Sequence, residues 1–220
     1  MMNIFSIFDP MTSLYFPLNW LSIMLIIIMS PYLYWMIPNR WNMMWFNLIK
    51  YIISELKIIL FNKIYMLNFI SIFCMIMIIN FMGLFSYIFT SSSHLTLSLS
   101  ISLPMWMGFM IIGWIYNTTH MFTHQVPMGT PNILMPFMVI IELISNLIRP
   151  FTLGVRLMAN MIAGHLLLTL MSSIGPKINI LSSTLLITTQ TLLMILEMSV
   201  ALIQAYVFTI LIALYSSEIK

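Results

Sequence analysis

Three charged side chains recur every seven residues within an apolar stretch of the chain: Glu142, Arg149 and Arg156. Seven residues make two helical turns less about 20°, so on a helix these side chains lie along one stripe. Polar residues three or four positions from members of the stripe widen it: Ser145, Asn146 and Asn160. Such groups can bind water and ions, and they are costly to place in lipid.

A second polar stripe has the same spacing further along the chain, at Gln190, Glu197 and Gln204. If the two stretches form consecutive antiparallel helices, the stripes can face each other or a common cavity. Carboxylates and histidine can gain and lose a proton, and Glu142, His165 and Glu197 supply these groups. Because no potassium filter of the TVGYG type is present, the pattern favours a proton path.

Arg156 has a different chemistry from these groups. A guanidinium group stays protonated in any protein environment, so it cannot pass a proton along. We therefore expect Arg156 to be a fixed positive charge that blocks one route and attracts an anion.

The composition places these stripes in a membrane protein. Only 6% of the 220 residues are charged and 61% are hydrophobic, whereas a soluble domain carries about 25% charged residues. Apolar runs of 18 or more residues recur, each long enough to cross a hydrocarbon core of about 30 Å. The chain has eight basic residues, and half of them lie close together within 39–63. They are too few and too local to bind nucleic acid, and they indicate membrane topology instead.

Burial cost limits what the charged stripe can be. Each charge at bilayer depth costs about 2.5–3.5 kcal/mol, so three or four approach ~10 kcal/mol, comparable to the stability of a typical domain. A lipid-facing placement is therefore excluded. Two interpretations remain open, an ion pair such as Glu142 with Arg149 that only stabilises the fold, and an aqueous ion pathway. The stripe as a whole favours the pathway.

The sequence predicts an all-α polytopic membrane protein, with 1–220 as a single membrane domain. We expect about five membrane-embedded helices and one interfacial amphipathic helix. The segments follow in this order: an N-terminal segment with the first span (1–38, the span at about 18–37), the amphipathic helix (39–63), two spans (64–116, at about 66–89 and 97–116), an inside loop (117–131) and a long helical hairpin (132–217).

The helix predicted over 39–63 differs from the spans. Its charges are spread among apolar residues and aromatic residues lie near its start, which is typical of a helix in the interface plane. The alternative is a helix that only packs on the protein surface. By the positive-inside rule this segment lies inside, so the N-terminus is predicted outside and 117–131 inside.

The stretches 132–170 and 178–217 are each nearly 40 residues long. As helices they measure about 60 Å, twice the membrane thickness, and ordinary tilts of 0–40° do not absorb the excess. We expect helices that bend and project, or a hairpin that crosses at a steep tilt, with its turn at Gly175 and Pro176.

Other candidate residues carry weaker signals. His120 and His124 are four residues apart but lack an evident third ligand, so no metal site is predicted. Cys74 lies in an apolar run and is expected to be a small core residue. No GxSxG, HExxH or nucleotide-binding loop is present, so the sequence predicts no catalytic residue and no cofactor.

Two motifs on the predicted hairpin, RPFTLGVRLMANMIAGH (149–165) and LEMSVALIQAYVF (196–208), closely resemble the a subunits of F-type ATP synthases in their mitochondrial form. The resemblance runs over essentially the whole chain, including NFMGLFSYIFT (80–90) and PNILMPFMVIIELISNLIRP (131–150).

The resemblance implies a non-catalytic stator subunit of a rotary, proton-driven motor in the mitochondrial inner membrane, with the N-terminus on the intermembrane-space side. The implied partners are a ring of c subunits, the peripheral stalk, other small membrane subunits and the lipid bilayer, with no nucleic acid. The translocated ligand would be the proton.

The resemblance also assigns residues. It implies that Arg156 is the essential arginine and that His165 and Glu197 carry protons, with Gln204 and Asn160 as polar partners and Glu142 in a second half-channel. The rest of the polar stripes would support them: Arg149, Ser145, Asn146 and Gln190. Bacterial relatives exchange the acid and the histidine between the positions of His165 and Glu197, which suggests that the two act as a unit.

An autonomous channel or a secondary transporter is the alternative class. Transporters usually show internal repeats and helices broken at the membrane midplane, and no repeat is visible in this sequence. A lone fixed arginine suits a stator better.

Overall fold

The regular structure of this computed structural model is helical throughout its described residues, which are 4–12, 16–32, 36–60, 63–85, 87–126, 131, 134–177 and 179–218. The α-helices of this part of the chain are α1 (Leu25–Met29), α2 (Arg40–Ile59), α3 (Lys63–Gly83), α4 (Leu95–Tyr116), α5 (Thr118–His124), α6 (Met135–Ile174) and α7 (Ile180–Glu218). Short 3-10 helices cover Ile4–Phe8, Leu18–Met24, Ser91–Ser93 and Gly175–Lys177. Four helices, α3, α4, α6 and α7, are long and apolar enough to cross a membrane. The predicted class, an all-α polytopic membrane protein, is confirmed.

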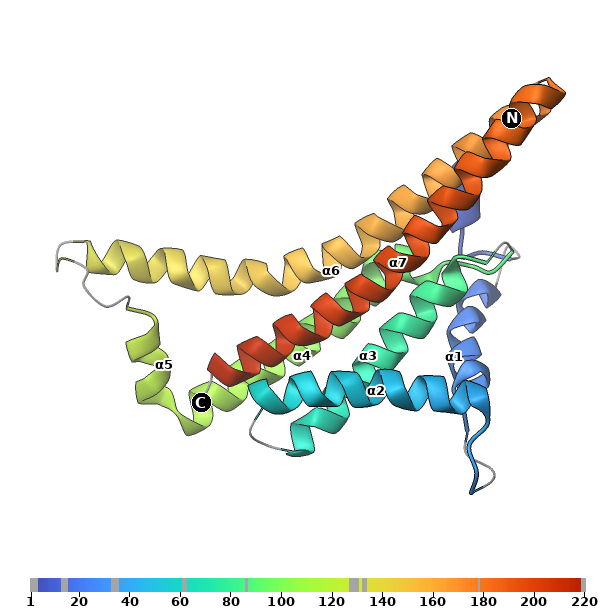
Figure 1. The fold of residues 1–220 in the computed structure, drawn as a ribbon. Helices are drawn as coiled ribbons and strands as arrows, with labels where there is room; N and C mark the ends of the chain where they lie inside the picture. The colour runs from blue at the N-terminus through green and yellow to red at the C-terminus, as the bar shows by residue number, and fades with distance from the viewer. Residues whose placement is uncertain are drawn as a thin grey trace.

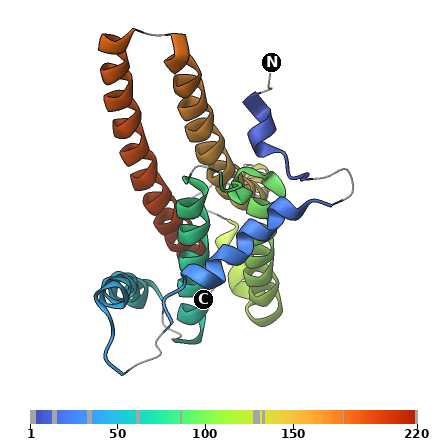
Figure 2. The ribbon, with the colours of Figure 1, turned by 90° about the vertical axis from the view of Figure 1, so that its right-hand side faces the viewer.

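The two ends of the molecule carry different segments. The N-terminal segment and the turn between α6 and α7 lie at one end, whereas α2, α5 and the C-terminus lie at the other (Figures 1 and 2). The N-terminal segment and α2 thus lie at opposite ends of the molecule.

The two long helices predicted at the C-terminal end of the chain are present. α6 has 40 residues and α7 has 39, and they run side by side towards their common turn (Figure 1). The N-terminal half of α6 bends away from α7. Pro150 lies inside α6, and a proline there removes one backbone hydrogen bond and clashes with the preceding turn.

The first predicted span, 18–37, is shorter than expected. A 3-10 helix leads into α1, which ends at Met29, and these apolar residues together are too few to cross about 30 Å. Ser30 has extended backbone (φ −65°, ψ 127°) because the following Pro31 disfavours a helical conformation in the residue before it. Residues 33–35 of the predicted span lie outside the described residues.

The predicted inside loop, 117–131, is partly helical, since α5 covers Thr118–His124. Met121 is buried, and α5 packs on α4. One buried apolar side chain thus ties this turn of helix to the rest of the protein. Residues 127–130 lie outside the described residues.

The second predicted span ends earlier than expected and the third begins earlier. α3 stops at Gly83 rather than near residue 89, and Tyr87 has a φ of 72°, which a right-handed helix does not allow. A 3-10 turn then leads into α4, which starts at Leu95.

The amphipathic helix is present as α2. One apolar side of it packs on α3 and α7. A second apolar strip on this helix is exposed: Trp41, Met44, Leu48, Tyr51 and Ile58. The helix therefore packs on the protein and also presents an apolar face outwards, and its place at the membrane surface stays a prediction.

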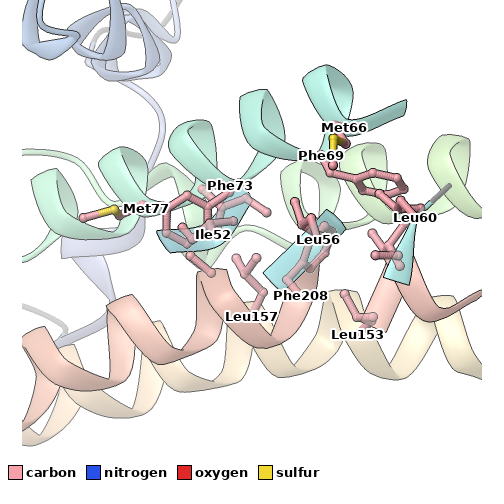
Figure 3. Close-up of a cluster of buried hydrophobic side chains, with 14 residues drawn as sticks. Ile52, Leu56, Leu60, Met66, Phe69, Phe73, Met77, Leu153, Leu157 and Phe208 are labelled. Carbon is pink, nitrogen blue, oxygen red and sulfur yellow. The ribbon is translucent and has the colours of Figure 1, made fainter. Parts of the chain in front are cut away.

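A cluster of buried apolar side chains joins α2, α3, α6 and α7. In Figure 3, Phe69 of α3 and Phe208 of α7 lie together with Leu56 of α2 and Leu157 of α6. Each of these side chains is almost fully buried. Their packing holds the middle of α6 against α7, and this is the region in which the two polar stripes lie.

Gly154 lets α6 approach α4 closely. A Cβ atom on Gly154 would lie 3.0 Å from Leu99 Cδ2 and 3.0 Å from Ser102 Oγ, both on α4. Small residues at helix contacts are typical of membrane proteins, where close backbone approach supplies much of the packing.

Gly154→Leu is therefore expected to force α4 and α6 apart and to lower the midpoint of thermal unfolding by about 5 °C, the effect of overpacking a tight contact. Gly108→Leu is the matched control, because nothing lies within 4 Å of a Cβ atom on Gly108. Thermal melts of the purified variants measure the difference. An equal loss for both glycines would contradict the close contact.

Candidate functional site

Polar side chains from three helices line a cavity of about 310 Å³ between α3, α6 and α7. We call it the Glu197 cavity. Its polar lining consists of Asn80, Asn160, His165, Glu197 and Gln204. The two predicted stripes meet here, since Asn160 Nδ2 donates a hydrogen bond to Gln204 Oε1 over 3.1 Å and so joins α6 to α7.

Several polar atoms of the Glu197 cavity are buried without a protein partner. Within the described residues, both carboxylate oxygens of Glu197, Nε2 of His165 and both amide atoms of Asn80 make no hydrogen bond. Buried polar groups in native proteins are normally bonded to protein or to ordered water. A polar site of this volume has room for water, so the cavity is suited to hold water beside a carboxylate and an imidazole.

Gly164 determines where the Glu197 carboxylate lies. A Cβ atom on Gly164 would lie 2.9 Å from Cδ and 2.9 Å from Oε1 of Glu197. The carboxylate therefore rests against the backbone of α6, one residue from His165, in space that a larger residue would fill.

A larger cavity, of about 840 Å³, is also lined by His165. We call it the N-terminal cavity, because Ser6, Ile7 and Asp9 line it together with Gln190 of α7 and the segment after α3. His165 and Leu84 line both cavities. The two cavities are thus neighbours that meet at these two residues.

A third, smaller cavity of about 40 Å³ lies at the opposite end, among α4, α5, α6 and α7. We call it the Arg149 cavity, and its polar lining includes His124, Gln125, Asn146, Arg149 and Tyr215. Arg149 Nη2 lies 3.8 Å from Glu142 Oε1, and the Arg149 guanidinium stacks 5.2 Å from the centre of the Tyr215 ring. The Arg149 cavity shares no lining residue with the other two.

Arg156 lines none of these cavities. It lies between the Arg149 and Glu197 cavities along α6, on an exposed face that also carries Thr152, Val155 and Ala159. Within the described part of the chain, no carboxylate lies within ion-pair distance of its guanidinium group. α6 is also the least buried of the four candidate spans. The arginine therefore presents an uncompensated charge to whatever contacts this face.

The structure divides the predicted residues into two groups with Arg156 between them. Asn160, His165, Glu197 and Gln204 line the Glu197 cavity, and Gln190 lines the N-terminal cavity. Glu142, Arg149 and Asn146 gather at the opposite end. Ser145 donates its hydroxyl to the Glu142 backbone carbonyl at 2.8 Å and lines no cavity described here.

The sequence does not predict several polar residues of these cavities. Asn80 lies on α3, for which no polar stripe is predicted, Tyr215 lies on α7 outside the spacing of seven, and Asp9 lies in the N-terminal segment. A signal existed for Asn80, because it is an amide directly after an unbroken apolar run, 72–79. Nothing in the sequence brings Asp9 close to His165.

No metal centre stands out in the described residues, where no group of three or more histidine, cysteine, aspartate or glutamate side chains could hold an ion. The rings of His120 and His124 lie 6.3 Å apart, and His124 lines the Arg149 cavity. His94 lies between the 3-10 turn and α4, where it packs against Trp20 and Phe89 and hydrogen-bonds the Phe8 carbonyl.

Comparison with known proteins identifies the family of this chain. A family model described as ATP synthase A chain matches residues 14–217. The chain belongs to the ATP synthase A chain family. Among curated relatives named ATP synthase subunit a, that of Locusta migratoria is 56% identical over 100% of this chain and 99% of its own. Those of Drosophila melanogaster and Anopheles gambiae are each 54% identical over the full length of both chains. The resemblance drawn from 149–165 and 196–208 is therefore confirmed.

Proposed function

We propose that this chain is the proton-conducting stator subunit of an F-type ATP synthase in the mitochondrial inner membrane. It carries no catalytic site of its own. Its α6–α7 face lies against a rotating ring of c subunits, each with a carboxylate within the membrane. The peripheral stalk and other small membrane subunits hold it in place.

The position of Arg156 carries this proposal. It is a permanent positive charge on an exposed face of a candidate span, between the Glu197 cavity and the Arg149 cavity, which share no lining residue. An unpaired charge at bilayer depth costs several kcal/mol unless a partner supplies the opposite charge. A carboxylate on a neighbouring subunit is the partner that this face requires.

The N-terminal and Glu197 cavities together form one half-channel, and the Arg149 cavity belongs to the other. The two half-channels open to opposite sides of the membrane. A proton entering through the N-terminal cavity passes His165 and Glu197 and neutralises a ring carboxylate. The neutral carboxyl group then tolerates contact with lipid as the ring turns. Glu142 and Arg149 belong to the second half-channel, by which the proton leaves.

Arg156 separates the two half-channels. A ring carboxylate that reaches it is favoured in the ionised form, because an opposite charge within about 4–6 Å stabilises that form. The proton is therefore released on the exit side and does not leak directly between the half-channels. The membrane potential contributes about 2.3 kcal/mol per proton per 100 mV, which drives rotation and hence ATP synthesis elsewhere in the complex.

The basic residues of α2 suggest the orientation. Arg40, Lys50 and Lys57 lie on this helix, and the positive-inside rule places it on the matrix side. The N-terminal segment lies at the other end of the molecule (Figure 2), so it faces the intermembrane space. α2 then lies along the membrane surface with its exposed apolar strip in lipid.

Purification distinguishes this proposal from an autonomous channel or transporter. Extracted in mild detergent, the chain is expected to come with a ring of small helical subunits. Vesicles that hold the chain alone are expected to conduct protons no faster than empty ones, because Arg156 then has no ring carboxylate to act on. Proton conduction by the isolated chain, measured with a pH-sensitive dye, would instead favour the autonomous channel.

A further inference from the structure

The N-terminal segment lines the N-terminal cavity, the largest of the three cavities described above. The N-terminal cavity reaches from Asp9 to His165, and its wall combines this segment with the residues after α3 and with both long helices. Asp9 is exposed, whereas Nε2 of His165 is buried. Asp9 therefore stands at the mouth of the hollow and His165 at its floor.

Specific contacts hold the segment in this place. The His94 ring donates Nε2–H to the Phe8 carbonyl oxygen over 3.0 Å, and Asn19 Nδ2 donates to the Asp9 carbonyl oxygen over 2.9 Å. The Phe8 ring meets the His165 ring edge to face, with centroids 6.5 Å apart. The Trp20 ring packs against the His94 ring, with the ring centroids 5.2 Å apart.

The charges around the mouth are few. Among the described residues that line the N-terminal cavity, Asp9 is the one with a formal charge, and the other titratable groups facing it are His165 and Tyr87. His94 is bonded to the Phe8 carbonyl oxygen and is not one of the residues that line the cavity. No lysine or arginine is among the described lining residues either. A carboxylate at the mouth of a cleft raises the local concentration of cations, including protons, and it can itself take up and release a proton.

From these contacts we infer that the segment Ile4–Asp9 forms the outer wall of the proton-uptake half-channel, and that the Asp9 carboxylate collects protons at its mouth for His165. This inference rests on the proposed function. It assigns Asp9 to proton uptake and not to the exchange with the ring.

Asp9→Asn in the complete reconstituted complex tests the inference. The rate of ATP synthesis is measured as a function of the proton concentration on the side of the membrane that the N-terminal segment faces. The pH on the other side and the membrane potential are held constant. At low ionic strength we expect the proton concentration for half-maximal rate to rise about threefold, the effect of one charge lost at the mouth. The maximal rate stays unchanged. At 1 M salt, where the screening length is about 3 Å, the difference should disappear.

Matched variants separate uptake from a structural effect. Asp9→Glu keeps the charge and should behave as wild type. Glu55→Gln removes a carboxylate from the exposed side of α2 at the other end of the molecule and should change nothing. His94→Leu, which loses the bond to Phe8, should raise the half-maximal proton concentration, and His94→Gln, which keeps a donor, should restore it.

Contrary results would overturn the inference in distinct ways. An unchanged half-maximal concentration in Asp9→Asn, or a lower maximal rate alone, would remove Asp9 from proton uptake. A wild-type half-maximal proton concentration in His94→Leu would show that the segment Ile4–Asp9 does not form the wall of the uptake half-channel. If the Asp9 variants behave as wild type while Arg156→Gln abolishes synthesis, the inference fails and the proposed function stands. If Arg156→Gln also has no effect, the proposed function itself fails.

Discussion

Arg156→Gln is expected to lower the rate of ATP-driven proton pumping in the reconstituted complex roughly a hundredfold or more, while the complex stays assembled. Glutamine keeps much of the length and polarity of the side chain but lacks the permanent charge. A ring carboxylate that reaches this position would then no longer be favoured in its ionised form. Losing even one neutral preorganised hydrogen-bond donor to a developing charge costs about 10²–10³ in rate in enzymes.

Arg156→Lys should also fail largely. An ammonium group can lose its proton when desolvated, and it lacks the planar fork that meets a carboxylate with two donors. Arg40→Gln is the matched control, since Arg40 is exposed at the start of α2 and lines none of the three cavities, and its loss should leave pumping unchanged. Assembly is followed by gel filtration and pumping by a pH-sensitive dye in the same vesicles.

Near-normal pumping by Arg156→Lys would show that any positive charge suffices at this position. Near-normal pumping by Arg156→Gln would refute the stator role, and the arginine would then be structural. Loss of the assembled ring in either variant would point to a docking role of α6 instead.

Glu197→Gln is expected to slow proton flux by at least about a hundredfold without dissociating the complex. The amide has nearly the same shape as the carboxyl group but cannot accept and release a proton, and positioned acid–base groups contribute about 10²–10⁴ in rate. The carboxylate oxygens make no protein hydrogen bond within the described residues, so the substitution breaks none there.

Gly164→Ala tests the position of this carboxylate separately from its chemistry. A Cβ atom on Gly164 would lie 2.9 Å from the carboxylate carbon, so Glu197 must move while keeping its charge and its proton. We expect about a tenfold slower flux, because displacements near 1 Å impair reacting groups strongly. Gly175→Ala is the control, as nothing lies within 4 Å of a Cβ atom on Gly175.

Flux is measured as the decay of an imposed pH difference through the complex, and assembly as the fraction that retains the ring. Wild-type flux in Glu197→Gln would exclude Glu197 from the proton path. Loss of assembly in that variant would show that the glutamate stabilises the packing of α6 on α7.

Much of the fold could be predicted because lipid imposes strict rules on sequence. A spanning segment must be long, apolar and hydrogen-bonded within itself, so the helices that became α3, α4, α6 and α7 were visible as apolar runs. Their ends were less predictable. Pro31 ended α1 early, and the backbone at Tyr87 ended α3 before residue 89, because local steric terms at single residues decide where a helix stops.

The sequence by itself determined the chemistry of the site. The spacing of seven placed Glu142, Arg149 and Arg156 on one helix and Gln190, Glu197 and Gln204 on the next, because helix periodicity is a local property. The cost of charge in lipid required these side chains to face protein or water.

Only the tertiary structure decided how these side chains are grouped. The packing of Leu157 and Phe208 and the bend of α6 away from α7 bring His165 and Glu197 into one cavity and leave Arg149 at the other end. Asp9 and His165, more than 150 residues apart in the chain, line one cavity, and the hydrogen bond from His94 to the Phe8 carbonyl holds the N-terminal segment there. Such contacts follow from shape and burial summed over the whole molecule, so no local pattern in the sequence records them.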